Sequence, residues 1–146
     1  YERQKKRAKQ QEVKLKMNLP QKYLMPVLSN ERYLKQVIEN LIDNAFQYTQ
    51  EGGKVTVGIK SLKEKVNVEI SDTGIGIPKK ERDNLFNKFS RAKNAVNTYG
   101  NGSGLGLFVV KKIIDTHTKD AKVYIKESKV NKGTTFAVSL PVVKNT

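Results

Sequence analysis

The sequence predicts an α+β fold in two layers, in which helices bury one face of a sheet. Five segments alternate apolar and polar residues, as half-buried strands do, and three others carry the spacing or end signals of helices. Along the 146 residues the order is strand, helix, two strands, helix, loop, helix and two strands. Elements in this order pack as a two-layer sandwich, and the length suits one domain with one core.

The first third of the chain supplies a strand and a long helix. Residues 1 to 12 are polar and lack an apolar face of their own, so we expect them to end a helix that packs on something outside this chain. Residues 13 to 19 alternate as a strand does, and Pro20 ends it. Ser29 or Asn30 can cap the next helix. Its apolar stripe consists of Leu34, Val37, Ile38, Leu41, Ile42 and Ala45.

The remaining strands are four alternating segments. Residues 55 to 59 and 66 to 70 predict a strand pair, and residues 121 to 125 and 136 to 140 predict two strands that close the chain. Together with the first strand they make a sheet of five.

Two helices and a loop lie between these strands. Pro78 suits the first turn of a short helix that carries Leu85 and Phe86. Residues 90 to 103 have few apolar anchors, which predicts a mobile loop. A last helix begins near Gly104, and one of its faces consists of Val110, Ile113, Ile114 and His117. His117 is the sole histidine, and this position predicts a structural role for it.

The composition narrows the possible functions. The chain has no cysteine, which excludes disulfides, thiolate metal sites and a cysteine nucleophile. No apolar segment approaches the ~20 residues of a membrane span. The formal net charge is +14, which fits either polyanionic partners, nucleotide phosphates among them, or a solvated lysine-rich surface. We do not expect nucleic acid as a partner, because no aromatic platform or helix-turn-helix pattern accompanies the charge.

Three motifs can carry chemistry. Asn40 and Asn44 share a helix face, and an amide oxygen can complete the coordination shell of a phosphate-bound magnesium ion. The segment 72 to 78, Asp-Thr-Gly-Ile-Gly-Ile-Pro, directly follows a predicted strand, and its glycines allow a sharp turn and a close approach to a ligand. The segment 100 to 107, Gly-Asn-Gly-Ser-Gly-Leu-Gly-Leu, opens a helix whose backbone N–H groups favour phosphate. Each motif alone also has a purely structural explanation.

The order of the motifs is more specific than any one of them. With the segment 86 to 89, Phe-Asn-Lys-Phe, they resemble the N, G1, F and G2 boxes of the sensor histidine kinase catalytic domain. This domain belongs to the superfamily that includes gyrase, the ninety-kilodalton heat-shock chaperone and the MutL repair protein. The resemblance covers about residues 13 to 141. It implies the Bergerat ATP-binding fold, a mixed five-stranded sheet with about three helices on one face.

The resemblance also implies which residues act. The catalytic set is Asn40, Asn44 and Arg91, in which Asn44 coordinates Mg²⁺, Asn40 supports the phosphates and Arg91 approaches the γ-phosphate. Asp72 binds the adenine amino group, Tyr48 lines the adenine side and Thr134 reaches the base through water. The implied ATP-binding set is Asn44, Gln47, Tyr48, Asp72, Gly74, Gly76, Ile77, Arg91, Gly102, Ser103, Gly104, Leu105, Gly106, Leu107 and Thr134. Phe86 and Phe89 anchor the near end of a lid.

By the same resemblance, the chain transfers the γ-phosphate of Mg-ATP to a histidine on a separate dimerisation domain, within two-component signalling. Residues 1 to 12 are then the tail of a connecting helix from that missing domain, and residues 13 to 146 are the ATP-binding catalytic domain. The implied partners are the histidine-bearing dimerisation domain of a homodimeric parent and a response regulator receiver domain. We expect this fragment to be a monomer and a cytoplasmic part of a parent that can be membrane-anchored.

Three departures from the family pattern leave alternatives open. Gln47 stands where lysine or arginine is usual, so a phosphate-binding cation is lost or supplied elsewhere, for example by Lys93. Ser90 replaces a common aromatic residue, and residues 117 to 119, His-Thr-Lys, replace His-Gly-Gly. The alternatives are a protein serine kinase of the anti-sigma-factor type, which shares the boxes, and a nucleotide-binding module without kinase activity.

Overall fold

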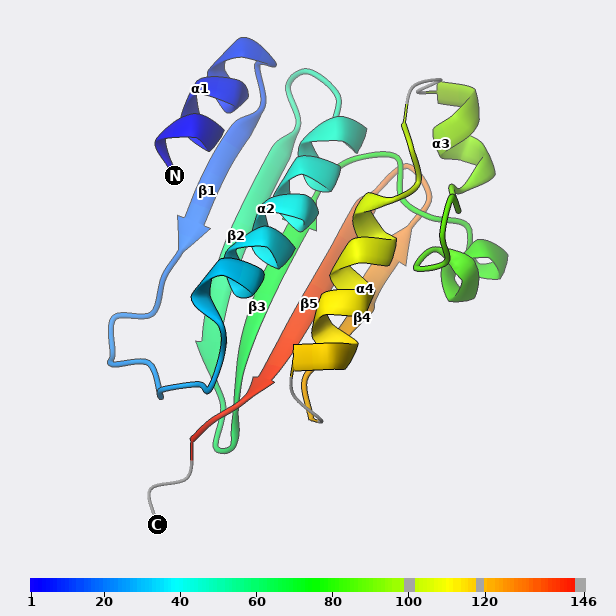
Figure 1. Cartoon of the computed structure of the whole chain (residues 1–146). Helices are drawn as coiled ribbons and strands as arrows, with labels where there is room; N and C mark the ends of the chain where they lie inside the picture. The colour runs from blue at the N-terminus through cyan, green and yellow to red at the C-terminus, as the bar shows by residue number, and fades with distance from the viewer. Residues whose placement is uncertain (99–101, 118–119, 144–146) are drawn as a thin grey trace.

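The computed structural model describes residues 1–98, 102–117 and 120–143, and its centre is a twisted five-stranded sheet (Figure 1). The strands follow the spatial order β1-β2-β3-β5-β4. β1 runs parallel to β2, whereas the other neighbours are antiparallel. Their bounds are Lys14–Asn18 for β1, Lys54–Ser61 for β2, Lys65–Asp72 for β3, Lys122–Lys129 for β4 and Gly133–Pro141 for β5. The expected mixed sheet of five strands is thus confirmed.

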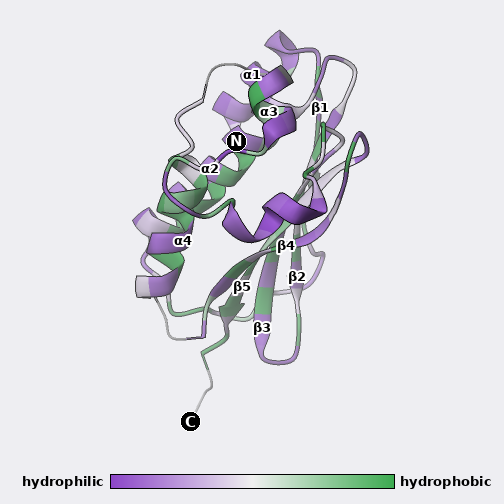
Figure 2. Ribbon diagram, turned by 90° about the vertical axis from the view of Figure 1, so that its right-hand side faces the viewer, coloured by the Kyte–Doolittle hydropathy of each residue, from purple (hydrophilic) through white to green (hydrophobic). Residues whose placement is uncertain are grey.

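Helices α2 (Glu31–Tyr48) and α4 (Gly106–His117) lie side by side on one face of this sheet, and their apolar sides face it (Figure 2). The other helical elements are α1 (Glu2–Gln10), the 3-10 helix η1 (Lys79–Asn84) and α3 (Lys93–Thr98). Of the two predicted caps for α2, Asn30 is the one observed, because its Oδ1 accepts a hydrogen bond from the Tyr33 N–H at 3.2 Å.

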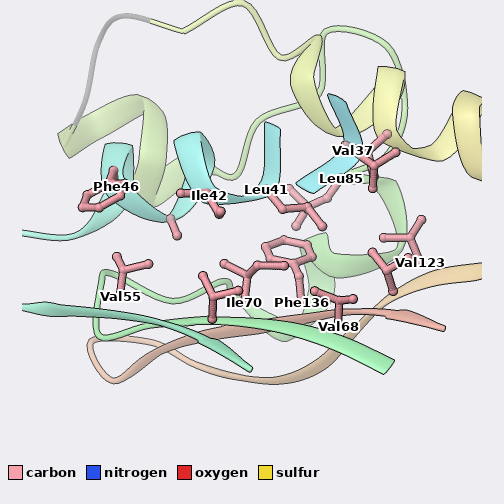
Figure 3. Close-up of a cluster of buried hydrophobic side chains, with 14 of the residues drawn as sticks. Val37, Leu41, Ile42, Phe46, Val55, Val68, Ile70, Leu85, Val123 and Phe136 are labelled. Atoms are coloured by element: carbon pink, nitrogen blue, oxygen red, sulfur yellow. The ribbon is translucent and has the colours of Figure 1, made fainter. Parts of the chain in front are cut away.

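The core lies between the two layers (Figure 3). Val37, Leu41 and Phe46 of α2 are buried against Ile70 of β3 and Phe136 of β5. Full burial of such a side chain contributes about 1.5–3 kcal/mol to folding. The predicted stripe on α2 therefore faces the sheet, and this fixes which side of the helix remains for a ligand.

Three predicted elements differ in detail from the structure, for physical reasons. The short helix after Pro78 is a 3-10 helix that ends before Leu85 and Phe86. The last helix begins two residues later than Gly104, whose φ of +68° is incompatible with a right-handed helix. The predicted loop, residues 90 to 103, contains α3, which is held by the buried side chains of two alanines, Ala92 and Ala95. Residues 99–101 of that loop lie outside the described residues.

The N-terminal helix is present, but it also packs on this chain. Gln4 and Ala8 of α1 are buried, and Ala8 joins the core cluster. One alanine and one glutamine on a polar helix give no apolar pattern, so the sequence did not reveal that this face of α1 packs on the rest of the chain. In the described residues no helix has both the length and the apolar character to cross a membrane. The side chain of His117, which ends α4, lies outside the described residues, so its predicted structural role stays a prediction.

Candidate functional site

A cleft opens where α2, the loop after β3, the α3 segment and the start of α4 meet. It is lined by Asn40, Asp43, Asn44, Gln47, Tyr48, Asp72, Ile75, Gly76, Ile77, Leu85, Ser90, Arg91, Ala92, Ala95, Gly102, Ser103, Gly104, Gly106, Leu107, Thr134 and Phe136. Every residue that the sequence assigned to a site is in this set except Gly74 and Leu105. Residues that lie far apart in the sequence, Thr134 and Phe136 of β5 among them, are therefore brought to one place.

One face of α2 forms the first wall of the cleft. Asn40, Asp43, Asn44 and Gln47 occupy positions i, i+3, i+4 and i+7, so their side chains form one row beside the apolar stripe. Asp43 did not figure among the predicted site residues. Its spacing of three from Asn40 is the signal that could have identified it.

Asp72 ends β3 at the opposite wall. Its Oδ1 accepts hydrogen bonds from the N–H groups of Gly74 at 2.8 Å and Thr134 at 3.3 Å. Burial raises the pKa of the Asp72 carboxyl to about 6, although these two backbone donors oppose the rise. The carboxyl is mostly ionised at neutral pH, and because both bonds use Oδ1, Oδ2 is available in the described structure to accept a hydrogen bond from an amine.

Close backbone contacts explain two glycines near Asp72. A Cβ on Gly74 would come within 2.1 Å of the Tyr48 carbonyl oxygen at the end of α2. A Cβ on Gly133 would lie 1.9 Å from the Asp72 carbonyl oxygen, and the φ of Gly133 is +115°. Gly74 is therefore required for packing behind the cleft wall, and it does not itself line the cleft.

The peptide groups around Ile77 are held by side chains that the sequence did not indicate. Ser128 Oγ accepts from the Ile77 N–H at 2.9 Å. Arg82 donates to the Ile77 carbonyl from Nε at 3.2 Å and Nη2 at 3.1 Å, and Nη2 also donates to the Ser128 carbonyl at 2.5 Å. Arg82 thus ties the loop after β3 to β4 and fixes the wall beside Asp72.

The far end of the cleft is polar and carries a cation. A Cβ on Gly102 would lie 3.0 Å from Arg91 Cζ and 3.1 Å from Gln47 Nε2, so the guanidinium and the amide flank this glycine together. Lys93, the suggested replacement for a basic residue at position 47, is exposed and does not line the cleft in the described structure. Arg91 is thus the basic side chain next to Gln47.

The start of α4 supplies backbone donors at this end. The first N–H groups of a helix have no partner within the helix, so they can bind phosphate. In α4 these groups belong to the first turn, whose residues Gly106 and Leu107 line the cleft. The Leu105 N–H differs, because it donates to Ser103 Oγ at 3.2 Å. Its predicted contact with phosphate would require that bond to break.

The α3 segment is attached by polar contacts to the loop after β3 and to η1. Asn94 Nδ2 donates to the Gly76 carbonyl at 2.9 Å, and the Lys93 N–H donates to Glu81 Oε2 at 2.7 Å. Phe86 is partly buried and meets Phe136 edge to face at 6.1 Å between ring centroids. Phe89 is 65% exposed and has a φ of +62°, so only its backbone, which donates to the Gly104 carbonyl, anchors the segment. Both phenylalanines were expected to anchor the near end of a lid, and here the side chain of Phe86 and the backbone of Phe89 make the contacts.

Known proteins resemble this chain over nearly all of its length. The model of the histidine kinase-, DNA gyrase B-, and HSP90-like ATPase family matches residues 29–144. The adaptive-response sensory kinase SasA of Gloeothece citriformis is 39% identical over 90% of this chain, and the sensor histidine kinase WalK of Bacillus subtilis is 35% identical over 92%. The chain spans only 32% and 22% of those two relatives. A nucleotide-free catalytic domain of the histidine kinase ThkA superposes with a TM-score of 0.81 at 27% identity, covering 99% of this chain and 90% of that one.

Proposed function

The chain belongs to the histidine kinase-, DNA gyrase B-, and HSP90-like ATPase family, as an ATP-binding catalytic domain of the histidine kinase type, and we propose that it transfers the γ-phosphate of ATP to a histidine on a separate domain. The observation that carries this proposal is the meeting of Asp72, the asparagine face of α2 and the start of α4 in one cleft. Asp72 can accept a hydrogen bond from an amine, the asparagines offer neutral oxygen ligands for a metal ion, and the backbone N–H groups of α4 can donate hydrogen bonds to phosphates. An adenine nucleotide needs all three.

Adenine recognition depends on Asp72. The ionised carboxyl accepts a hydrogen bond from the exocyclic amine of adenine, whereas guanine has an acceptor at the corresponding atom. Ile77 and Tyr48 bound the base, and Thr134 stands on the strand beside Asp72. Arg82 and Ser128 hold this wall in place, so binding requires little rearrangement.

Asn44 fits a magnesium ion, because it lines the cleft and its amide oxygen is a hard, neutral ligand. When bound, Mg²⁺ neutralises part of the charge on the phosphates. Asn40 stands one turn earlier, and an amide cannot act as a general base. This favours transfer to an incoming acceptor over activation of water.

Arg91 and the first N–H groups of α4 orient the terminal phosphates. Phosphoryl transfer demands mainly positioning and charge neutralisation, which a guanidinium and a helix start both supply. We propose the remaining partners by resemblance: a histidine-bearing dimerisation domain joined through α1, and a response regulator receiver domain. We further propose a homodimeric parent, a monomeric fragment and a cytoplasmic location, where ATP is available.

Calorimetric titration of the chain with ATP tests the proposal. We expect ATP to bind only when Mg²⁺ is present. ADP should bind as well, whereas GTP should not. An absence of heat at millimolar Mg-ATP would exclude the function. Of the reported relatives, WalK is named as a sensor histidine kinase and ThkA as a histidine kinase, which favours this function over a serine kinase of the anti-sigma-factor type.

A further inference from the structure

Asp43 introduces a negative charge into the row of side chains that faces the phosphates. It lies between Asn40 and Asn44 on the cleft side of α2, and its side chain is 35% exposed. A bare carboxylate at this place would repel a polyphosphate, and repulsion between partly buried charges is only weakly screened. Nucleotide binding is therefore favoured when another group cancels this charge.

Helix α1 supplies that group. Arg7 Nη1 donates to Asp43 Oδ1 at 2.7 Å, and the Arg7 side chain is 28% exposed. Its guanidinium also lies 5.3 Å from the ring centroid of Phe46, a second contact that holds it over α2. Arg3 comes no closer than 3.7 Å to Asp43 Oδ2 and is 70% exposed, so Arg7 is the principal partner.

The attachment of α1 is otherwise limited. Its buried residues are Gln4 and Ala8, and within the described residues Gln4 Oε1 is buried without a hydrogen-bond donor. A buried acceptor without a donor opposes docking of the helix. The helix joins β1 through Glu12, whose φ of +51° is unfavourable for a residue other than glycine. Release of α1 would relieve both costs.

From this geometry we infer that Arg7 is a positioning residue through which α1 sets the affinity of the cleft for nucleotide phosphates. With α1 docked, Arg7 cancels the charge of Asp43 and ATP binds. With α1 displaced, the carboxylate is uncovered and repels the phosphates. By linkage, bound ATP in turn holds α1 against α2. The inference rests on the proposed nucleotide site and adds to it a connection with the N-terminal helix.

The test compares Mg-ATP and Mg-ADP affinities for the whole chain and its variants by calorimetry. Arg7→Gln should weaken ATP binding about five-fold, the lower range of measured site couplings, and should weaken ADP binding less because Mg-ADP carries less negative charge. Adding Asp43→Asn to Arg7→Gln should restore ATP binding, since the repelling charge is gone. The loss should shrink at high salt. Lys9→Gln removes the same charge from an exposed position of the same helix and should change neither affinity.

Several results would overturn the inference. Equal weakening of ATP binding by Arg7→Gln and by Lys9→Gln would show that only the net charge of the chain matters. ATP binding that stays weak in the double variant would show that Asp43 does not transmit the effect. Hydrogen exchange of the unsubstituted chain gives a test free of folding defects, and there ATP should slow exchange in α1 more than ADP does. Unchanged exchange in α1 despite measured ATP binding would contradict the inference, whereas no ATP binding at all would instead reject the proposed function.

Discussion

Asp72 should make the stability and the nucleotide affinity of this chain respond to pH in opposite directions. Burial raises the pKa of its carboxyl from an ordinary value of 3.8 to about 6. A carboxyl with a higher pKa in the folded than in the unfolded chain binds its proton more tightly when folded. Protonation of Asp72 therefore stabilises the fold, and this stabilisation grows as the pH falls below about 6.

The shift sets the size of the effect. One pKa unit corresponds to 1.36 kcal/mol, so a rise of about two units gives up to about 3 kcal/mol, of which about 1.5 kcal/mol appears between pH 6 and 4.5. Binding has the opposite sign, because the adenine amine needs the ionised carboxyl. Below about pH 6 the ATP affinity should fall, and the fall should approach ten-fold per pH unit, because the amine of bound ATP favours the ionised form of the Asp72 carboxyl.

Asp72→Asn isolates these effects, because an amide oxygen can still accept from the N–H groups of Gly74 and Thr134. Urea unfolding of both proteins at several pH values gives the difference in unfolding free energy, in which general charge repulsion cancels. We expect the unsubstituted chain to gain about 1.5 kcal/mol relative to Asp72→Asn between pH 6 and 4.5. At pH 7 the variant should bind ATP more weakly by about 1–3 kcal/mol. A difference in stability that does not change with pH, or an unchanged affinity, would refute the reasoning.

Three further predictions concern single side chains. Asn44→Ala should abolish the dependence of ATP binding on Mg²⁺, and calorimetry that still shows this dependence would place the ion elsewhere. Arg82→Ala should weaken ATP and ADP binding to the same extent, because Arg82 holds the adenine wall through Ile77 and Ser128; a loss confined to ATP would contradict that role. Leu41→Ala should lower the unfolding free energy by about 2–5 kcal/mol, since Leu41 is fully buried, and a loss under 1 kcal/mol in urea titration would show a core that collapses around the gap.

The strands and the main helix could be predicted because their patterns are local. Val55 and Val68 alternate with polar neighbours in sequence, and each is buried in the core between the sheet and the helices. The asparagine face of α2 follows from helical spacing once the apolar stripe is known. The resemblance to a family added what periodicity could not, namely that Asp72 and the glycine-rich segment near Gly104 belong to one site.

The parts that escaped prediction depend on contacts between distant segments. Arg82 and Ser128 are 46 residues apart, and Arg7 and Asp43 are 36 apart, so no local pattern links them. The α3 helix is held by small buried side chains and by hydrogen bonds from Asn94, neither of which gives a hydrophobic period. Charged and polar residues acquire their partners only when the fold brings them together.

Phosphorylation with radiolabelled ATP tests the central claim most directly. The chain is incubated first alone and then with the histidine-bearing domain of its parent chain. His117 ends α4 about 16 Å from its start, at 1.5 Å per residue, so it should not reach a phosphate bound there. We predict acid-labile, base-stable label on the added domain only. Such label on this chain alone, absent from His117→Ala, would contradict the proposed function.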